Sequence, residues 1–300
     1  MSLSNSILDT RFRSALGRMA ERGRLQTYTA PVDPHLEAAG LMKKLDGGPA
    51  LLFAKMIGHD MPVIGNLLSC QANVEAAFGV DFRGVREFVG RALGEPKPPV
   101  LVERAPAQEI VYRANIDLGR MLPALHHTEA DAGRYITAGI VITRDPETEV
   151  YNASYHRLMI AGPNRAGIQL DFGRHLRAAF ERAQKRGQDL PVVVCIGSDL
   201  ALHYTAATMG SQMPESADEL AVAGGLCGRP LPVVKAVSQD LLVPAESEIV
   251  LEGVLKHDQE IVEGPFGEFV GYLAPADPAP VLEVTAVTHR AKPIYHAISG

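Results

Sequence analysis

Apolar positions in the first hundred residues follow two periods, one typical of helices and the other of short strands. Helical spacing runs through residues 6–23 and again through residues 82–94, and both segments end at a glycine. Between them, residues 50–58 and 61–68 are short apolar runs around a turn, which predicts a buried pair of strands. The stretch EPKPPV that follows is stiff and proline-rich, which favours a boundary. We therefore predict an N-terminal α/β domain over residues 1–105.

Strand patterns dominate the rest of the chain. Residues 134–145 and 149–162 read as strands around the turn DPET, an amphipathic helix covers residues 172–187, and an apolar strand follows at 190–197. The further elements that we expect are a helix over 199–208 and strands over 231–237, 248–255, 268–273 and 281–290. Strands with a few inserted helices indicate a barrel-like β domain over residues 106–300, so the predicted fold class is α+β.

Composition limits the kind of ligand. The 300 residues include 46% hydrophobic and 21% charged residues, with a net charge of −6, which is ordinary for a globular protein. This charge gives no general attraction to nucleic acid or to an anionic membrane, and no apolar run could span a bilayer, so we expect a small-molecule ligand. The three cysteines form neither a disulfide framework nor a zinc motif, and Cys195 in its apolar run indicates a packed thiol in the cytoplasm. The sequence has no glycine-rich dinucleotide or phosphate loop.

Two acids flank a sharp bend in the segment IVEGPFGEFVGY, residues 261–272. Glu263 and Glu268 stand on either side of Gly-Pro-Phe-Gly, and on a regular strand a spacing of five would send them to opposite faces. The bend can break this alternation and turn both carboxylates toward one site. The alternative interpretation is a solvated loop with two surface glutamates.

Three other places carry candidate chemistry. In YNASYHR, a strand would put alternate residues on two faces, with Asn152, Ser154 and His156 on one and Tyr155 and Arg157 on the other. The planar fork of Arg157 suits a carboxylate or a phosphate, although an ordinary surface salt bridge would use it equally. Arg174 and His175 open a helix, where a histidine is commonly a surface or capping residue. Glu219 falls in the early turns of another helix, where the dipole favours an acid whatever its function.

These residue types nevertheless form two coherent groups. An amide, an imidazole and a carboxylate suit Mn²⁺ or Mg²⁺ better than a metal that prefers thiolates, and the candidates are Asn152, His175 and Glu219. A cation between two anions keeps one acid ionised and lets the other exchange a proton, and the candidates are Arg157, Glu263 and Glu268.

The segment HHTEAD contains several potential metal ligands: His126, His127, Glu129 and Asp131. It can be interpreted as a metal cluster. Adjacent histidines do not share a face on a strand, which favours a role in a substrate loop or in the structure.

The chain resembles the UbiD family of decarboxylases, which use prenylated FMN. The similar segments are DAGRYITAG, YNASYHRLMI, the histidine of GRH, VVKAVSQDLLVPAESEIVLEG and EGPFGEFVGY. The resemblance implies a split β-barrel flavin-binding domain in which Asn152, His175 and Glu219 hold Mn²⁺ or Mg²⁺ at the flavin phosphate, with K⁺ nearby. The other implied flavin contacts are Thr137, Arg174 and the segment from Asn152 to Arg157, including Ser154, Tyr155 and His156.

The implied activity is reversible, non-oxidative decarboxylation of an aromatic, heteroaromatic or α,β-unsaturated carboxylic acid. Arg157, Glu263 and Glu268 would be the catalytic residues, with Glu268 as the proton donor. A flavin prenyltransferase would supply the cofactor, and the complete enzyme would be a homo-oligomer built through a C-terminal domain that we expect these 300 residues to lack. Two alternatives are a catalytically silent flavin-binding or assembly protein and a metal-dependent hydrolase that uses the Asn/His/Glu group.

Overall fold

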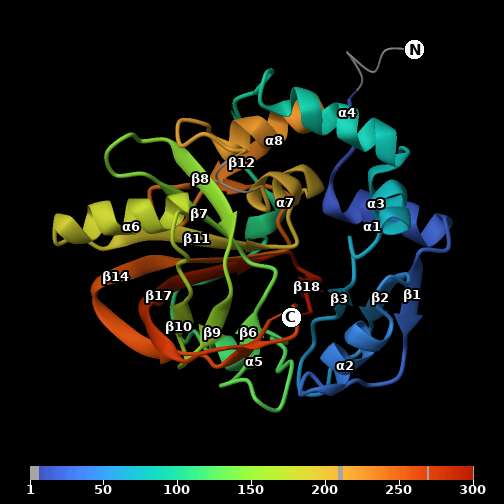
Figure 1. Cartoon of the computed structure of the whole chain (residues 1–300), viewed down its shortest axis with the longest axis horizontal. Helices are drawn as coiled ribbons and strands as arrows, with labels where there is room; N and C mark the ends of the chain where they lie inside the picture. Colours follow the sequence, from blue (N-terminus) through green and yellow to red (C-terminus); the bar gives the residue numbers. More distant parts are fainter. Residues whose placement is uncertain (1–6, 209–211, 269, 300) are drawn as a thin grey trace.

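The N-terminal region of the chain mixes helices with a small sheet. The computed structural model describes residues 7–208, 212–268 and 270–299 (Figure 1). The elements of this region are α1 (Phe12–Glu21), β1 (Leu25–Tyr28), α2 (Glu37–Lys44), β2 (Ala50–Phe53), β3 (Val63–Gly65), α3 (Gln71–Phe78) and α4 (Phe82–Ala92). The antiparallel pairing of β2 with β3 confirms the predicted pair of strands.

The last strand of the chain returns to this first sheet. β18 (Tyr295–His296) pairs parallel with β3, so the sheet has the order β1-β2-β3-β18 (Figure 1). The N-terminal sheet is therefore completed by residues that follow the larger β region. The domain boundary at residue 105 remains a prediction.

The larger region is built on a curled antiparallel sheet. Among the described residues this sheet has the order β6-β9-β10-β17-β14-β11-β7-β8, with β5 paired to β17. Its strands are β5 (Ile110–Tyr112), β6 (Tyr135–Ile136), β7 (Ile140–Arg144), β8 (Tyr151–Tyr155), β9 (Leu158–Ile160), β10 (Arg165–Ile168), β11 (Leu190–Ile196), β14 (Ile249–Glu263) and β17 (Asp277–His289). Two register shifts in the long β14–β17 hairpin help the sheet to curl. Figure 1 shows the resulting half-barrel beside the N-terminal region.

Helices inserted between the strands cover this half-barrel. They are η1 (Pro106–Gln108), α5 (Leu118–Met121), α6 (His175–Lys185), α7 (Leu200–Ala206) and α8 (Glu219–Cys227). α6 packs on β11 and β14, while α7 and α8 pack on β8. Two small sheets complete the region, formed by β4 (Val100–Leu101), β12 (Pro232–Lys235) and β13 (Leu242–Pro244), and by β15 (Phe266–Gly267) and β16 (Leu273–Ala274). The α+β class with helical insertions is confirmed. In the described part of the chain, no helix is long and apolar enough to cross a membrane.

Three predicted strands are wrong in detail. The strand expected over residues 134–145 is broken into β6 and β7, and the strand expected over residues 149–162 is broken into β8 and β9. The strand expected over 268–273 is also wrong: residues 270–272 lie in a turn and Leu273 begins β16. The Glu268 amide donates to the Tyr272 carbonyl at 2.9 Å, and the Gly271 amide donates to the Glu268 carbonyl at 2.9 Å. Gly271 has φ +92°, which a side chain would disfavour. The break between β8 and β9 contains Arg157, and the turn before β16 follows Glu268, so two of these interruptions adjoin candidate catalytic residues.

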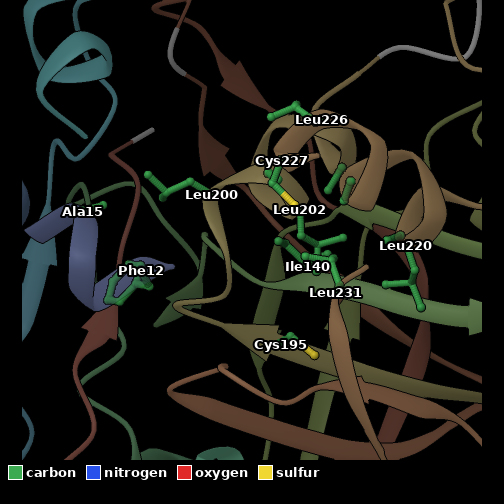
Figure 2. Packing of buried hydrophobic residues seen from close by; sticks show 14 of the residues in the cluster. Phe12, Ala15, Ile140, Cys195, Leu200, Leu202, Leu220, Leu226, Cys227 and Leu231 are labelled. Carbon is green, nitrogen blue, oxygen red and sulfur yellow. The ribbon is translucent and has the colours of Figure 1, made fainter. Parts of the chain in front are cut away.

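An apolar core joins the two regions. Figure 2 shows Phe12 and Ala15 of α1, residues of α7 and α8, and Ile140 and Cys195 of the curled sheet, which all belong to one buried cluster. The Cys195 thiol is fully buried, and burial raises its pKa to about 12. Cys195 is free, as the packed-thiol prediction requires.

One buried carboxylate ties the regions together. Glu248 has no exposed surface and accepts hydrogen bonds from the Arg13 guanidinium of α1 at 2.7 and 2.8 Å. It also accepts the Ile294 amide at 2.9 Å, and the Arg290 Nε lies 3.2 Å away. A single carboxylate therefore links the first helix, the end of β17 and the segment that leads into β18.

Glu248→Gln should destabilise the fold, because it leaves the charges of Arg13 and Arg290 facing a neutral amide. Removing one partner of a buried ion pair costs about 3–5 kcal/mol, and we expect the lower end because Arg13 is partly exposed. Urea unfolding followed by circular dichroism measures the free energy. Glu246→Gln is the control: Glu246 also pairs with Arg290, at 2.6 Å, but its side chain is 31% exposed, so its loss should cost below about 1 kcal/mol. Equal costs would contradict the linking role of Glu248.

Candidate active site

The structure brings Arg157, Glu263 and Glu268 together. Arg157 lies at the break between β8 and β9, and its Nε and Nη2 donate to the two oxygens of Glu263 at 3.0 and 2.9 Å. Its Nη1 donates to Glu268. The bend between the two acids needs glycine at position 264, where φ is +91° and a Cβ would meet the Pro275 carbonyl oxygen at 2.6 Å. The predicted convergence of both acids on one arginine is therefore what the bend produces.

The two acids differ in their access to solvent. The exposed fraction of the side chain is 1% for Glu263, 14% for Arg157 and 26% for Glu268. Burial alone would lower the pKa of Arg157, but its hydrogen bonds to Glu263 and the charges of both acids raise it overall, so the guanidinium stays charged. Glu263 is therefore the buried partner that holds Arg157 through two hydrogen bonds, whereas Glu268 is the partner open to solvent.

Aromatic rings close the other side of Arg157. Its guanidinium lies 5.2 Å from the centre of the Phe266 ring, and the Tyr135 ring lies 4.4 Å from Phe266. Burial, together with the nearby charge of Glu263, raises the pKa of Tyr135, so its phenol stays protonated. Sequence reasoning did not assign Tyr135 or Phe266, because single aromatic residues in apolar segments read as core.

The structure also groups Asn152, His175 and Glu219. Glu219 begins α8 and His175 begins α6, and the His175 Nδ1 lies 3.6 Å from Glu219 Oε1. The Asn152 amide donates to the same oxygen at 2.9 Å. Burial raises the pKa of Glu219, and its hydrogen bond raises the pKa of His175. The second carboxylate oxygen, Glu219 Oε2, is buried without a hydrogen-bond partner, as an open ligand position would be.

The hydrogen bonds around Ser154 test whether a cation fits this group. His156 Nδ1 donates to the Gln169 carbonyl at 2.8 Å, so its Nε2 must accept from Ser154 at 3.0 Å. The Asn152 amide oxygen lies 3.1 Å from the same hydroxyl, but the single proton of Ser154 is already donated to His156, so two acceptors face each other. Rotating the amide by half a turn resolves this conflict and leaves the amide oxygen facing Glu219. Two such oxygens and an imidazole suit a hard divalent cation.

The other predicted flavin contacts are dispersed. Arg174 and Ser154 line the same small cavity as the Asn/His/Glu group. The Thr137 hydroxyl instead accepts the Ile298 amide at 3.0 Å, and the Tyr155 hydroxyl contacts His203, a residue that sequence reasoning missed. Their contacts with a flavin remain predictions.

The HHTEAD segment does not form a metal cluster in the described part of the chain. Among the described residues, the acidic and histidine side chains close enough to one another to share a metal ion are Asp189, His257 and Asp258. Asp189 is already paired with Lys256 at 2.5 Å. Asp131 of HHTEAD instead accepts hydrogen bonds from protein donors, which supports the structural interpretation.

The curled sheet therefore carries a cation between two acids, and a second group of amide, imidazole and carboxylate side chains. Residues 16–93 match the 3-octaprenyl-4-hydroxybenzoate carboxy-lyase N-terminal domain, and residues 100–300 match the Rift-related domain of the same carboxy-lyase. The chain belongs to the UbiD family.

Solved structures agree with this assignment. The UbiD-class enzyme HmfF from Pelotomaculum thermopropionicum, in complex with FMN, is 42% identical with a TM-score of 0.91, covering 96% of this chain and 64% of that chain. The closed form of vanillic acid decarboxylase from Sedimentibacter hydroxybenzoicus is 29% identical with a TM-score of 0.91 and the same coverage of 96% and 64%. An uncharacterised protein of Rhodospirillum rubrum is 33% identical over 94% of this chain and 63% of its own length. The chain thus spans less than two thirds of these relatives.

Buried histidines next to Tyr155 should make stability depend on pH. His203 Nε2 accepts the Ser198 amide at 3.1 Å, and the His296 ring packs edge-on against His203 at 5.0 Å. Burial lowers the pKa of His296 to about 4 and that of His203 well below its usual value. Because the folded pKa lies below the unfolded value, this stability is complete above about pH 6.5 and is lost as the pH falls toward 4.

His296→Phe removes one of these titrations while it keeps a ring of similar size. Between pH 7 and pH 4.5, the parent should lose about 2–3 kcal/mol more of its unfolding free energy than the variant. Urea unfolding of the flavin-free chain at both pH values measures this difference. Parallel pH profiles for the two proteins would show that His296 is not held neutral by the fold.

Proposed function

We propose that this chain carries the flavin-binding part of a reversible, non-oxidative decarboxylase that uses prenylated FMN. The substrate would be an aromatic, heteroaromatic or α,β-unsaturated carboxylic acid. The observation that carries the proposal is the unequal pair of acids around Arg157, one buried and fixed and the other within reach of a ligand. The FMN complex of HmfF supports the flavin.

The residues present fit the cofactor and its metal. Asn152, His175 and Glu219 would hold Mn²⁺ or Mg²⁺ at the flavin phosphate, with K⁺ nearby, and the buried unpartnered oxygen of Glu219 supports this assignment. Thr137, Arg174 and the segment 152–157 would contact the flavin. When bound, prenylated FMN supplies an electron-accepting iminium that stabilises the charge left behind as CO₂ departs.

Protein side chains would position the substrate and handle protons. Glu263 holds the Arg157 guanidinium in place through two hydrogen bonds, and the remaining N–H groups of Arg157 can bind the substrate carboxylate. Glu268 contacts Arg157 through Oε1, so Oε2 can carry the proton for the carbon that loses CO₂. Phe266 and Tyr135 exclude water from one side of the guanidinium.

The wider setting follows from the same proposal. A flavin prenyltransferase would supply the cofactor, the protein would act in the cytoplasm, and the complete enzyme would be a homo-oligomer. An absorption spectrum and an intact mass of the bound cofactor, from protein co-expressed with a flavin prenyltransferase, test the central point. A colourless, metal-loaded protein would favour the hydrolase alternative.

Glu219→Ala and His175→Ala should each lose Mn²⁺ and flavin together. The cation would neutralise the repulsion between the Glu219 carboxylate and the flavin phosphate, so neither ligand binds well without it. Metal analysis and flavin absorbance, both per protein, measure the two losses. Glu215→Ala, which removes an exposed acid four residues upstream, should keep both ligands. A metal-free Glu219→Ala protein with full flavin occupancy would overturn the assignment.

The two acids around the bend should fail differently. Glu268→Gln keeps size and hydrogen bonding but cannot deliver a proton, so turnover should fall about 10²–10⁴-fold while flavin still binds. Glu263→Gln weakens the hold on Arg157 and should leave measurable turnover. The assay is decarboxylation with solvent-deuterium exchange into the product, on flavin-loaded protein. Glu260→Gln is the matched control, because Glu260 is an exposed acid of β14, the strand that ends at Glu263. Parent-like turnover by Glu268→Gln would show that another group donates the proton.

A further inference from the structure

Asp131 of the HHTEAD segment is a buried carboxylate with four donors. It is 6% exposed, and its Oδ2 accepts the amides of His127 at 3.1 Å and Thr128 at 2.9 Å. Its Oδ1 accepts the Thr128 hydroxyl at 2.8 Å and the Gly267 amide at 2.9 Å. Three of these bonds close the local turn, but the fourth reaches 136 positions along the chain, to the residue before Glu268.

A second bond ties the same loop to the other side of the bend. The Ala132 amide donates to the Pro265 carbonyl at 2.9 Å, so residues 127–132 hold the bend through both Pro265 and Gly267. The approach is close: a Cβ on Gly267 would lie 3.1 Å from Thr128 Cγ2. Only glycine lets the loop and the bend meet at this distance without a shift.

The loop also supports the ring beneath Arg157. His127 packs edge-on against Phe266 at 5.7 Å, and Phe266 lies under the guanidinium. Burial lowers the pKa of His127 to about 4, so the ring is neutral and acts as an apolar wall near neutral pH. Loop 127–132 therefore contacts the site through the Asp131 carboxylate, the Ala132 amide and the His127 ring.

The backbone of Glu268 is held by its hydrogen bonds with Tyr272 and Gly271, but its side chain has few restraints. Its side chain is 26% exposed and contacts Arg157 through one oxygen, and β15, the strand before it, has two residues. We propose that Asp131 is a positioning residue for Glu268: the charged acceptor fixes the Gly267 amide and so sets where the next residue presents its carboxyl. This role rests on the proposed function, in which Glu268 donates the proton.

Asp131→Asn tests this role, because an amide cannot accept at both oxygen positions. A hydrogen bond to a charged acceptor contributes about 1.5–3 kcal/mol, so the Gly267 amide should exchange with solvent about 10–100-fold faster. This exchange is measured on the flavin-free chain by NMR or mass spectrometry. In flavin-loaded protein, turnover should fall about 10–100-fold with little change in KM or flavin content. The solvent isotope effect on kcat should rise, because proton delivery becomes limiting.

Asp145→Asn is the matched control. Asp145 is 7% exposed and also closes a turn, accepting the amides of Glu147 and Thr148 at 2.8 and 3.0 Å, but it stands before β8 rather than beside the bend. Its loss should lower thermal stability without changing the isotope effect. The positioning role is wrong if both variants change kcat and the isotope effect alike, or if Gly267 exchange is unchanged in Asp131→Asn.

Gly267→Ala approaches the same contact from the bend and leaves the Asp131 charge in place. The added methyl should push the bend from the loop and lower kcat. Thr128→Ser in the same protein removes the opposing Cγ2, keeps the hydroxyl donor, and should restore turnover. Failure of this rescue contradicts the proposal. The proposed function and the positioning role can fail separately. Parent-like turnover of Glu268→Gln would refute Glu268 as the proton donor. Normal turnover of Asp131→Asn together with an inactive Glu268→Gln would refute only the positioning role.

Discussion

The burial of the positively charged Arg157 guanidinium is the constraint on which the rest of the site depends. A guanidinium that is 14% exposed is stable only where anions meet it, and Glu263 meets it with two hydrogen bonds. This pairing requires the break between β8 and β9, the end of the long strand β14 and the bend at Gly264 to converge on one point. In the strand order, β10 and β17 separate β9 from β14, and the curl of the sheet brings the ends of these two strands together.

Strand β8 divides the chemistry of the region. Asn152 and Ser154 point to one side, where they join Glu219 and, through the Ser154 hydroxyl, His156. Tyr155 points to the other side and contacts His203 on α7. The period of two residues in an extended chain thus lets one short strand contribute Asn152 to the Asn/His/Glu group and Tyr155 to the contact with α7. Arg157 follows β8 directly, so Asn152 and Arg157 are only a few residues apart in the sequence.

Local patterns predicted much of this structure, and distant contacts account for what they missed. The apolar run of β11, the amphipathic α6 and the two acids around Gly-Pro-Phe-Gly are properties of contiguous residues. The pairing of β18 with β3 and the bond from Gly267 to Asp131 join segments more than a hundred positions apart, and no periodicity encodes them. Where local pattern and structure disagree, as in the turn that follows Glu268, the interruption lies beside a candidate catalytic residue. Such failures are expected at functional sites.

Unequal burial explains why two acids rather than one meet this arginine. A proton donor changes its charge in every turnover, and if it were the only partner of Arg157, each protonation would leave a buried cation unpaired, at a cost of several kcal/mol. In the proposed function, Glu263 would keep the cation paired throughout, so that the more exposed Glu268 could deliver the proton. The positioning role proposed for Asp131 follows the same reasoning: a hydrogen bond to the Glu268 carboxyl itself would favour one protonation state, whereas the bond to the Gly267 backbone amide fixes position without this effect.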